Sequence, residues 1–133
     1  MHGSRLLKKN FYLVDTNIVI RFLTKDHKEL SEKSAELFKK IEKGEIRAKI
    51  TESVLAEIVY VITKIYGKDR AFTARTIKKI LDLKGIVNRD KSQLKKALNI
   101  FANQKIDIVD SLLLSRAKNC LGVLSFDKDL KNQ

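Results

Sequence analysis

The sequence predicts an α/β protein with a mainly parallel sheet inside a three-layer α/β/α sandwich. Short apolar runs alternate with longer amphipathic segments along the chain, which is the pattern of parallel α/β folds. The run Phe11–Val14 is apolar or aromatic throughout, as is typical of a strand buried on both faces. With 44% hydrophobic content, residues 1–133 are expected to form a single domain, in which residues 1–10 are a disordered or tag-derived segment.

The N-terminal half is expected to contain two strands and three helices. The strands cover residues 11–14 and 47–50, and the helices cover residues 17–24, 26–43 and, from 51 or 52, up to 66. Asp26 and Glu29 have the spacing of a capping box, which opens a helix, and Gly44 fits the stop at the other end. These signals predict where the second helix begins and ends.

The C-terminal half repeats the pattern. Helices are expected over residues 69–83, from residue 90 onward and over residues 108–119, with strands over residues 86–88 and 123–125. Asp69 is the expected cap of the first of these helices, and Asp90 with Gln93 gives a second capping-box signature. The chain therefore supplies four strands, separated by helix pairs, for one parallel sheet.

The charge balance is the most informative feature of the composition. Lysine and arginine number 28 against 16 aspartates and glutamates, which gives a net charge of +12. Heat-adapted proteomes raise lysine and glutamate together, whereas bases outnumber acids here. A polyanionic partner, most simply a nucleic acid, is therefore expected, with an anionic membrane surface or an acidic protein as alternatives.

The composition disfavours several classes of active site. The two histidines, His2 and His27, fall in a terminal segment and a turn, so a histidine-based nucleophile or a zinc site is not expected. The single cysteine, Cys120, is expected to be a small buried hydrophobe, and the five glycines form no phosphate-binding loop. No apolar run has membrane-spanning length and no signal peptide is recognisable, so a cytoplasmic protein that makes no membrane contact is expected.

Carboxylates remain as the candidate catalytic groups. Asp15 and Asp127 each follow an apolar run, at the carboxyl edge where open α/β sheets place their ligands. Asp107 and Asp110 flank the start of a helix and are three residues apart, so they can share a face. Glu57 lies among apolar residues of the long helix, where an acid needs a partner or a metal. These acids are expected to meet at one edge of the sheet.

Each acid also has a purely structural explanation. Asp15 could cap the helix that follows it, and Asp107 is more simply read as the cap of its own helix. Asp127 or Asp129 could cap a last helical turn, which is the preferred role for Asp129, and Glu57 could extend to a lysine such as Lys64 or to solvent. Taken singly, these roles explain each acid as well as catalysis does. Taken together, acids on two strand ends and two helices favour a shared site.

A cluster of carboxylates needs a compensating cation. Ionised neighbours repel one another, and without a cation one or more stays protonated. Oxygen ligands without histidine or cysteine suit Mg²⁺ or Mn²⁺, which can activate a water molecule and neutralise charge on a phosphodiester. An acidic metal site that cuts nucleic acid fits a basic protein that holds the nucleic-acid backbone.

Four short motifs contain these acids. They are Val14-Asp15-Thr16-Asn17, Ala56-Glu57-Ile58-Val59-Tyr60, Asp107-Ile108-Val109-Asp110-Ser111-Leu112-Leu113 and Ser125-Phe126-Asp127-Lys128-Asp129. In this order, on the expected elements and over about residues 11–130, they resemble the motifs of PIN-domain proteins of the VapC-like toxin ribonuclease type.

The resemblance implies a PIN-like sheet of four strands, or of five, because family members usually carry a further strand after the last acid. It implies a Mg²⁺- or Mn²⁺-dependent endoribonuclease that cleaves RNA phosphodiesters by means of a metal-activated water. The implied catalytic and metal-binding residues, called the acidic quartet below, are Asp15, Glu57, Asp110 and Asp127. The implied auxiliary residues, which orient carboxylates or water, are Asn17, Asp107 and Ser125.

Toxins of this kind are homodimers silenced by a cognate antitoxin, so both partners are expected. Arg21 and Arg116 are assigned to contacts with RNA or antitoxin from their helix positions. A housekeeping RNA-processing nuclease, without an adjacent antitoxin reading frame, and a catalytically silent RNA-binding module, without metal binding, are the alternative functions. A receiver domain or a phosphatase is disfavoured, because both need further acids that Asp15-Thr16-Asn17 and Ile86-Val87-Asn88 do not provide.

Overall fold

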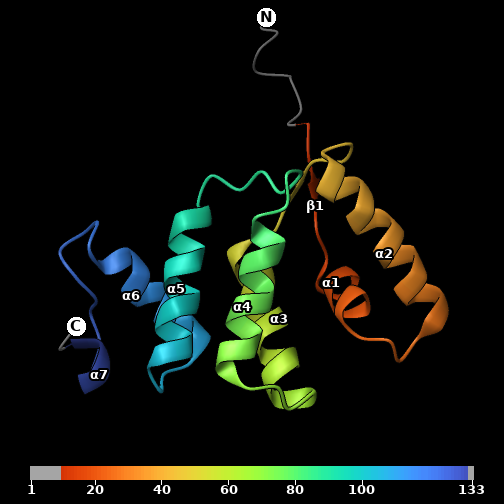
Figure 1. Cartoon of the computed structure of the whole chain (residues 1–133). Helices are drawn as coiled ribbons and strands as arrows, with labels where there is room; N and C mark the ends of the chain where they lie inside the picture. The colour runs from red at the N-terminus through yellow and green to blue at the C-terminus, as the bar shows by residue number, and fades with distance from the viewer. Residues whose placement is uncertain (1–9, 132–133) are drawn as a thin grey trace, which may run out of the picture.

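The computed structural model describes residues 10–131, in which helices surround one small sheet. In chain order the elements are β1 (Tyr12–Leu13), α1 (Thr16–Leu23), α2 (Lys28–Lys43), β2 (Ala48–Lys49), α3 (Glu52–Tyr60), the π-helical segment η2 (Val61–Ile65), α4 (Arg70–Leu81), α5 (Lys91–Asn103), α6 (Ile108–Ala117) and α7 (Lys128–Lys131). Figure 1 shows the helices ranged in a row, with α2 at one end and α6 and α7 at the other. The α/β class is confirmed, although helices dominate. The segment expected over residues 1–10 lies, apart from Asn10, outside the described residues.

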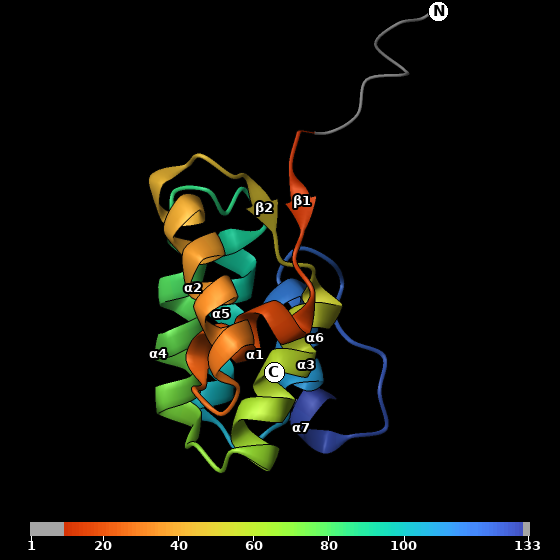
Figure 2. The same ribbon diagram turned by 90° about the vertical axis from the view of Figure 1, so that its right-hand side faces the viewer.

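The two strands pair in parallel. Tyr12 lies opposite Ala48 and Leu13 opposite Lys49, and Figure 2 shows β1 and β2 side by side near one end of the molecule. The strand expected over residues 86–88 is reduced to a parallel bridge between Ala48 and Ile86. The sheet is therefore parallel, as expected, but each strand is short.

Beyond this bridge, the side chain of Asn88 makes the hydrogen bonds to the residue after β2 that the backbone of a neighbouring strand would make. Its Oδ1 accepts a hydrogen bond from the Ile50 N–H at 2.9 Å, and its Nδ2 donates to the Ile50 carbonyl at 2.6 Å. Asn88 Nδ2 also donates to Asp90 Oδ1 at 3.0 Å, while Gln93 donates to the carbonyl of Ser115. The capping box expected for α5 therefore does not form, because both of its side chains have other partners.

One face of the sheet is covered by helices except at Tyr12, which pairs with Ala48 and is 71% exposed. Side chains alternate between the faces of a strand, and the covered face buries Val14, Ala48, Ile50, Ile86 and Asn88. The other face, called the open face below, carries the exposed or half-buried side chains of Phe11, Leu13, Arg47, Lys49, Val87 and Arg89. Charged side chains resist burial without partners, so helices do not close over this face. The structure departs here from the expected three-layer sandwich.

The fourth strand expected over residues 123–125 does not form. Residues 118–127, called the C-terminal arm below, follow α6 as irregular chain, and the side chains of Leu121, Leu124 and Phe126 are fully exposed. Figure 1 shows this arm, in blue, at the end of the row of helices farthest from α2. A strand forms only against a neighbouring strand, and within the described residues the arm pairs with none. Residues 128–131 form α7, so they contain no fifth strand either.

Cys120 lies in this arm and is exposed, not buried as expected. Its Sγ lies 3.6 Å from the carbonyl oxygen of Arg116, at the end of α6. The expectation of a buried cysteine fails because the arm that carries it does not pack on the core.

The start of α2 also differs from the expected capping box. His27 is the N-cap, and its Nδ1 accepts a hydrogen bond from the Leu30 N–H at 3.2 Å. The Asp26 carboxylate instead accepts a hydrogen bond from the Tyr66 hydroxyl at 2.8 Å, which is the main reason why the pKa of Asp26 lies below its usual value. The capping-box spacing predicted that the Asp26 carboxylate binds the backbone N–H of Glu29. It binds instead the hydroxyl of Tyr66, which is 40 residues away in the sequence.

The core lies between the covered face of the sheet and the helices around it. Its largest fully buried side chains include Phe38, Ile41, Leu55, Ile58 and Leu98. Removing each from water contributes about 1.5–3 kcal/mol to folding. In the described part of the chain, no helix is both long and apolar enough to cross a membrane.

Candidate functional site

Asp15 and Asn17 stand at the start of α1, directly after β1. Asp15 has the N-cap position, but its side chain makes no capping hydrogen bond, so the structural role considered for it is not observed. Thr16, between them, is only 5% exposed, and its Oγ1 has no hydrogen-bond partner among the described residues. A carboxylate and an unsatisfied hydroxyl therefore occur together at a strand end, where α/β sheets place their ligands.

Glu57 projects from the second turn of α3 into solvent. The helix that carries it packs against α1 and also against α6, and Figure 2 shows these three helices grouped together. Lys64 is not among its ion-pair partners, because the ion pairs of the described residues all lie elsewhere. The carboxylate of Glu57 thus has no structural partner in this part of the chain.

Asp107 and Asp110 open α6. Asp107 is the N-cap, and its Oδ1 accepts a hydrogen bond from the Asp110 N–H at 2.8 Å, which confirms its structural role. Partial burial raises the pKa of the Asp110 carboxyl above its usual value, and the negative charges of Asp107 and Asp127 raise it further. The Asp110 carboxylate is therefore repelled by two other carboxylates near the start of this helix.

Ser125 and Asp127 shape the end of the C-terminal arm. The Ser125 hydroxyl accepts a hydrogen bond from the Asp127 N–H at 2.9 Å, and Asp127 Oδ1 accepts one from the Asp129 N–H at 2.9 Å. Asp127 therefore caps the final turn, as its structural explanation predicted, whereas Asp129, for which a capping role was preferred, does not cap it. The Asp127 charge also reaches Asp110, as the raised pKa of Asp110 records.

The candidate acids form two groups. Asp107, Asp110 and Asp127 interact electrostatically, whereas Asp15 and Glu57 lie on the neighbouring helices α1 and α3. Within residues 10–131, no three histidine, cysteine, aspartate or glutamate side chains lie close enough together to hold one ion. The donor chemistry fits a hard divalent cation, which would relieve the repulsion at Asp110. The spacing fits only if the two groups come closer together.

Arg21 and Arg116, assigned to RNA or antitoxin, both form ion pairs. Arg21 Nη1 lies 3.1 Å from Asp26 Oδ1. Arg116 donates from Nε to Glu52 Oε2 at 3.2 Å, which raises the pKa of the guanidinium, and its Nη2 lies 3.6 Å from Asp90 Oδ2. Sequence reasoning missed Glu52 and Asp90, because acids at helix starts are ordinarily explained by the helix dipole.

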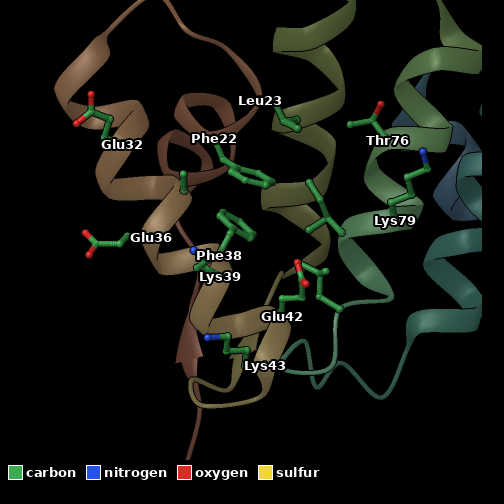
Figure 3. Close-up of a pocket in the computed structure, with 13 residues that line it drawn as sticks. Phe22, Leu23, Glu32, Glu36, Phe38, Lys39, Glu42, Lys43, Thr76 and Lys79 are labelled. Carbon is green, nitrogen blue, oxygen red and sulfur yellow. The ribbon is translucent and has the colours of Figure 1, made fainter.

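A large cavity lies away from these acids. It occupies about 810 Å³ beside α2 and α4, and Figure 3 shows the rings of Phe22 and Phe38 facing each other inside it. Their centroids are 4.3 Å apart. Its charged lining residues are Glu32, Glu36, Glu42, Lys39, Lys43 and Lys79. The groove therefore has an aromatic floor and no net charge, and none of the quartet lines it.

Comparison with known proteins gives one match. The family model described as "PIN domain" matches residues 12–133, from β1 through all four motifs. No curated protein and no solved structure matches the chain.

Proposed function

The chain belongs to the PIN-domain family, whose members are generally metal-dependent nucleases, and from this we propose that it is a Mg²⁺- or Mn²⁺-dependent endoribonuclease. One observation carries the proposal. The acids of the four motifs stand on α1, α3, α6 and the C-terminal arm, which either pack against one another or interact electrostatically. The net charge of +12 supports a polyanionic substrate.

We infer that Asp15, Glu57 and Asp110 are the principal ligands of the ion, with Asp127 as the fourth acid. A bound divalent ion supplies charge neutralisation at the phosphodiester and activates a water molecule for attack. The raised pKa of Asp110 supports this role, since a cation beside it would favour the ionised form that repulsion now disfavours.

The auxiliary residues are proposed to position this quartet. Asp107 holds the first turn of α6, and therefore the backbone of Asp110, through its N-cap hydrogen bond. Ser125 holds the backbone of Asp127 in the same way. Asn17 lies two residues after Asp15 and is proposed to orient that carboxylate or a water beside it.

The C-terminal arm is proposed to complete the sheet and the site together. β1 has a strand on one side only, and Tyr12 and Leu13 are 71% and 67% exposed. Leu124 of the arm is fully exposed as well. Pairing residues 123–125 with β1 would bury these side chains, add the fourth parallel strand and bring Asp127 to the strand end that carries Asp15.

The finer assignment is a VapC-like toxin, which acts as a homodimer and is silenced by a cognate antitoxin. The four motifs support the subtype. Exposed apolar side chains on α3 and α6 support the homodimer. The exposed fractions are 58% for Tyr60, 57% for Val109 and 45% for Leu113. An antitoxin reading frame beside the gene would support the toxin, and its absence would favour a housekeeping nuclease.

Calorimetric titration of Mn²⁺ tests the metal site. Wild-type protein and Asp129→Asn, the matched control, are expected to bind Mn²⁺ saturably, whereas Asp110→Asn should bind about tenfold more weakly or worse. The titration is repeated with RNA present, since substrate phosphates can complete the shell of such an ion. Failure of wild type to bind under both conditions would reject the nuclease and favour the silent RNA-binding module.

RNA cleavage tests the individual acids. Asp15→Asn and Asp110→Asn are each expected to abolish cleavage while keeping a cooperative thermal transition. If either variant cuts RNA as well as wild type, the role assigned to that residue is wrong.

A further inference from the structure

We propose that the open face of the sheet, together with the end of α6, forms a binding cleft for single-stranded RNA. The proposal relies on the proposed function only for the identity of the polymer. The cleft itself, its charge and its shape come from residues that the acidic site does not use.

The cleft is built by strand geometry. β1 and β2 pair in register, and β2 is bridged to Ile86, so side chains at alternate positions of three chain segments emerge on one side. Phe11, Arg47, Lys49 and Val87 are such side chains. With Arg89 and the end of α6 they enclose a hollow of about 470 Å³.

The charge of this hollow sets it apart from the larger cavity beside α2 and α4. Arg47, Lys49, Arg89 and Arg116 line it, against the single carboxylate of Asp90, for a net charge of +3. The larger cavity is lined by equal numbers of acids and bases. Charge complementarity therefore selects a polyanion for the hollow on the open face.

Two of its cationic side chains form no interaction that stabilises the fold. Lys49 and Arg89 take part in none of the hydrogen bonds or ion pairs of side chains in the described residues, whereas Arg116 is held by Glu52 and Asp90. Arg47 donates to Asn10. Unpaired guanidinium and ammonium groups in a concave site suit phosphate oxygens, which a guanidinium can bind in a bidentate manner.

The floor and size of the cleft favour a single strand. The half-buried ring of Phe11 lines it, and aromatic rings between basic side chains provide the stacking surface that single-stranded nucleic acids use. A hollow of this volume holds a drug-sized ligand, or about one to two nucleotides. A base-paired duplex cannot offer an unstacked base to this floor.

The helix α6 connects the cleft to the proposed catalytic acids. Arg116 lies at its last turn and Asp110 at its first, six residues earlier, which corresponds to about 9 Å along the helix axis. A strand held against Arg116 would thus run along α6 toward Asp110. The cleft is the anchoring site for the part of the substrate next to the bond that is cut.

Fluorescence anisotropy with a labelled 12-nucleotide oligouridylate tests the proposal, using metal-free protein in chelator so that no cleavage occurs. Lys49→Gln/Arg89→Gln removes two charges from the cleft, and Lys64→Gln/Arg75→Gln, the matched control, removes two exposed charges elsewhere. The cleft variant should bind about tenfold more weakly at 0.1 M salt, and its slope of log K against log salt should fall by about 1.4. The control should change affinity less than twofold.

Three outcomes would overturn the proposal. Equal losses in the two double variants would mean that only the overall field attracts RNA. Equal affinity of wild type for duplex and single-stranded RNA would reject the stacking floor. A cleft variant that loses affinity for an acidic peptide but not for oligouridylate would make the cleft a protein-binding site. Thermal unfolding checks each fold, and the single variant Arg89→Gln, at an exposed turn, replaces the double variant if that one unfolds.

The two proposals fail separately. Loss of RNA binding in the cleft variant with no Mn²⁺ binding by wild type would leave a single-strand binding cleft without a nuclease. Normal Mn²⁺ binding with unchanged RNA affinity in the cleft variant would leave the nuclease and reject the cleft.

Discussion

Replacing Asn88 by alanine should destabilise the fold strongly, because beyond the bridge between Ala48 and Ile86 its side chain alone, among the described residues, joins Ile50 to the neighbouring segment. Asn88 is 6% exposed and Ile50 is fully buried, and the two hydrogen bonds between them satisfy both backbone groups of Ile50. Alanine would leave these two groups buried without partners, at about 1–3 kcal/mol each, or about 2–6 kcal/mol in total. Since domains of this size are stable by about 5–15 kcal/mol, the loss is a large share.

The assay is thermal unfolding followed by circular dichroism. At roughly 4 °C for each kcal/mol, the expected fall in Tm for Asn88→Ala is about 8–24 °C. Asn103→Ala, an exposed asparagine, is the control and should change the free energy of unfolding by less than about 0.5 kcal/mol. Asn88→Asp keeps the acceptor but faces the Ile50 carbonyl with a second oxygen, so it should regain stability as the pH falls and that carboxyl becomes a donor. A Tm for Asn88→Ala within about 2 °C of wild type would refute the reasoning.

Three further predictions concern stability. Because the pKa of Asp110 is raised in the folded protein, its ionised form opposes folding: metal-free Asp110→Asn should melt above wild type at pH 7, and the difference should disappear as the pH falls below the unfolded-state pKa. A lower melting temperature at pH 7 would contradict this. Arg70 donates to one backbone carbonyl in the last turn of α5 and to two in the α5–α6 connection, so Arg70→Ala should cost about 2–3 kcal/mol in urea unfolding, with faster tryptic cleavage at Lys105. Thr16→Val should stabilise the metal-free protein by about 1 kcal/mol, since the hydroxyl is buried without a partner, and a loss of stability would show that the hydroxyl has one.

Local sequence signals predicted the helices well where the N-cap side chain finds its partner within a few residues. Asp69, for example, caps α4 by accepting a hydrogen bond from the Phe72 N–H at 2.7 Å, three residues on. The same reasoning failed at Asp26, where Tyr66 competes for the carboxylate across 40 residues. Spacing along the chain contains no information about such distant partners.

Strand pairing and the geometry of the site were harder for the same reason. The apolar alternation of residues 123–126 shows that they can form a strand, but the pairing depends on whether the arm reaches β1. Motifs identified the acids by residue type, and the placement of Asp107 as a cap followed from its neighbours. The distances between Asp15, Glu57 and Asp110 depend on how three helices pack, which no local pattern specifies.

The π-helical segment η2 directly after α3 has a consequence for how relatives of this chain will align with it. The Tyr66 N–H donates to the Val61 carbonyl at 3.1 Å, five residues back, so this turn holds one residue more than an α-helical turn does. Deleting one residue between Val61 and Ile65 would restore the regular pitch downstream and leave α3 unchanged. Alignments of homologous sequences should therefore place single-residue gaps after Tyr60, and Glu57 should keep its column whether or not a relative has the extra residue.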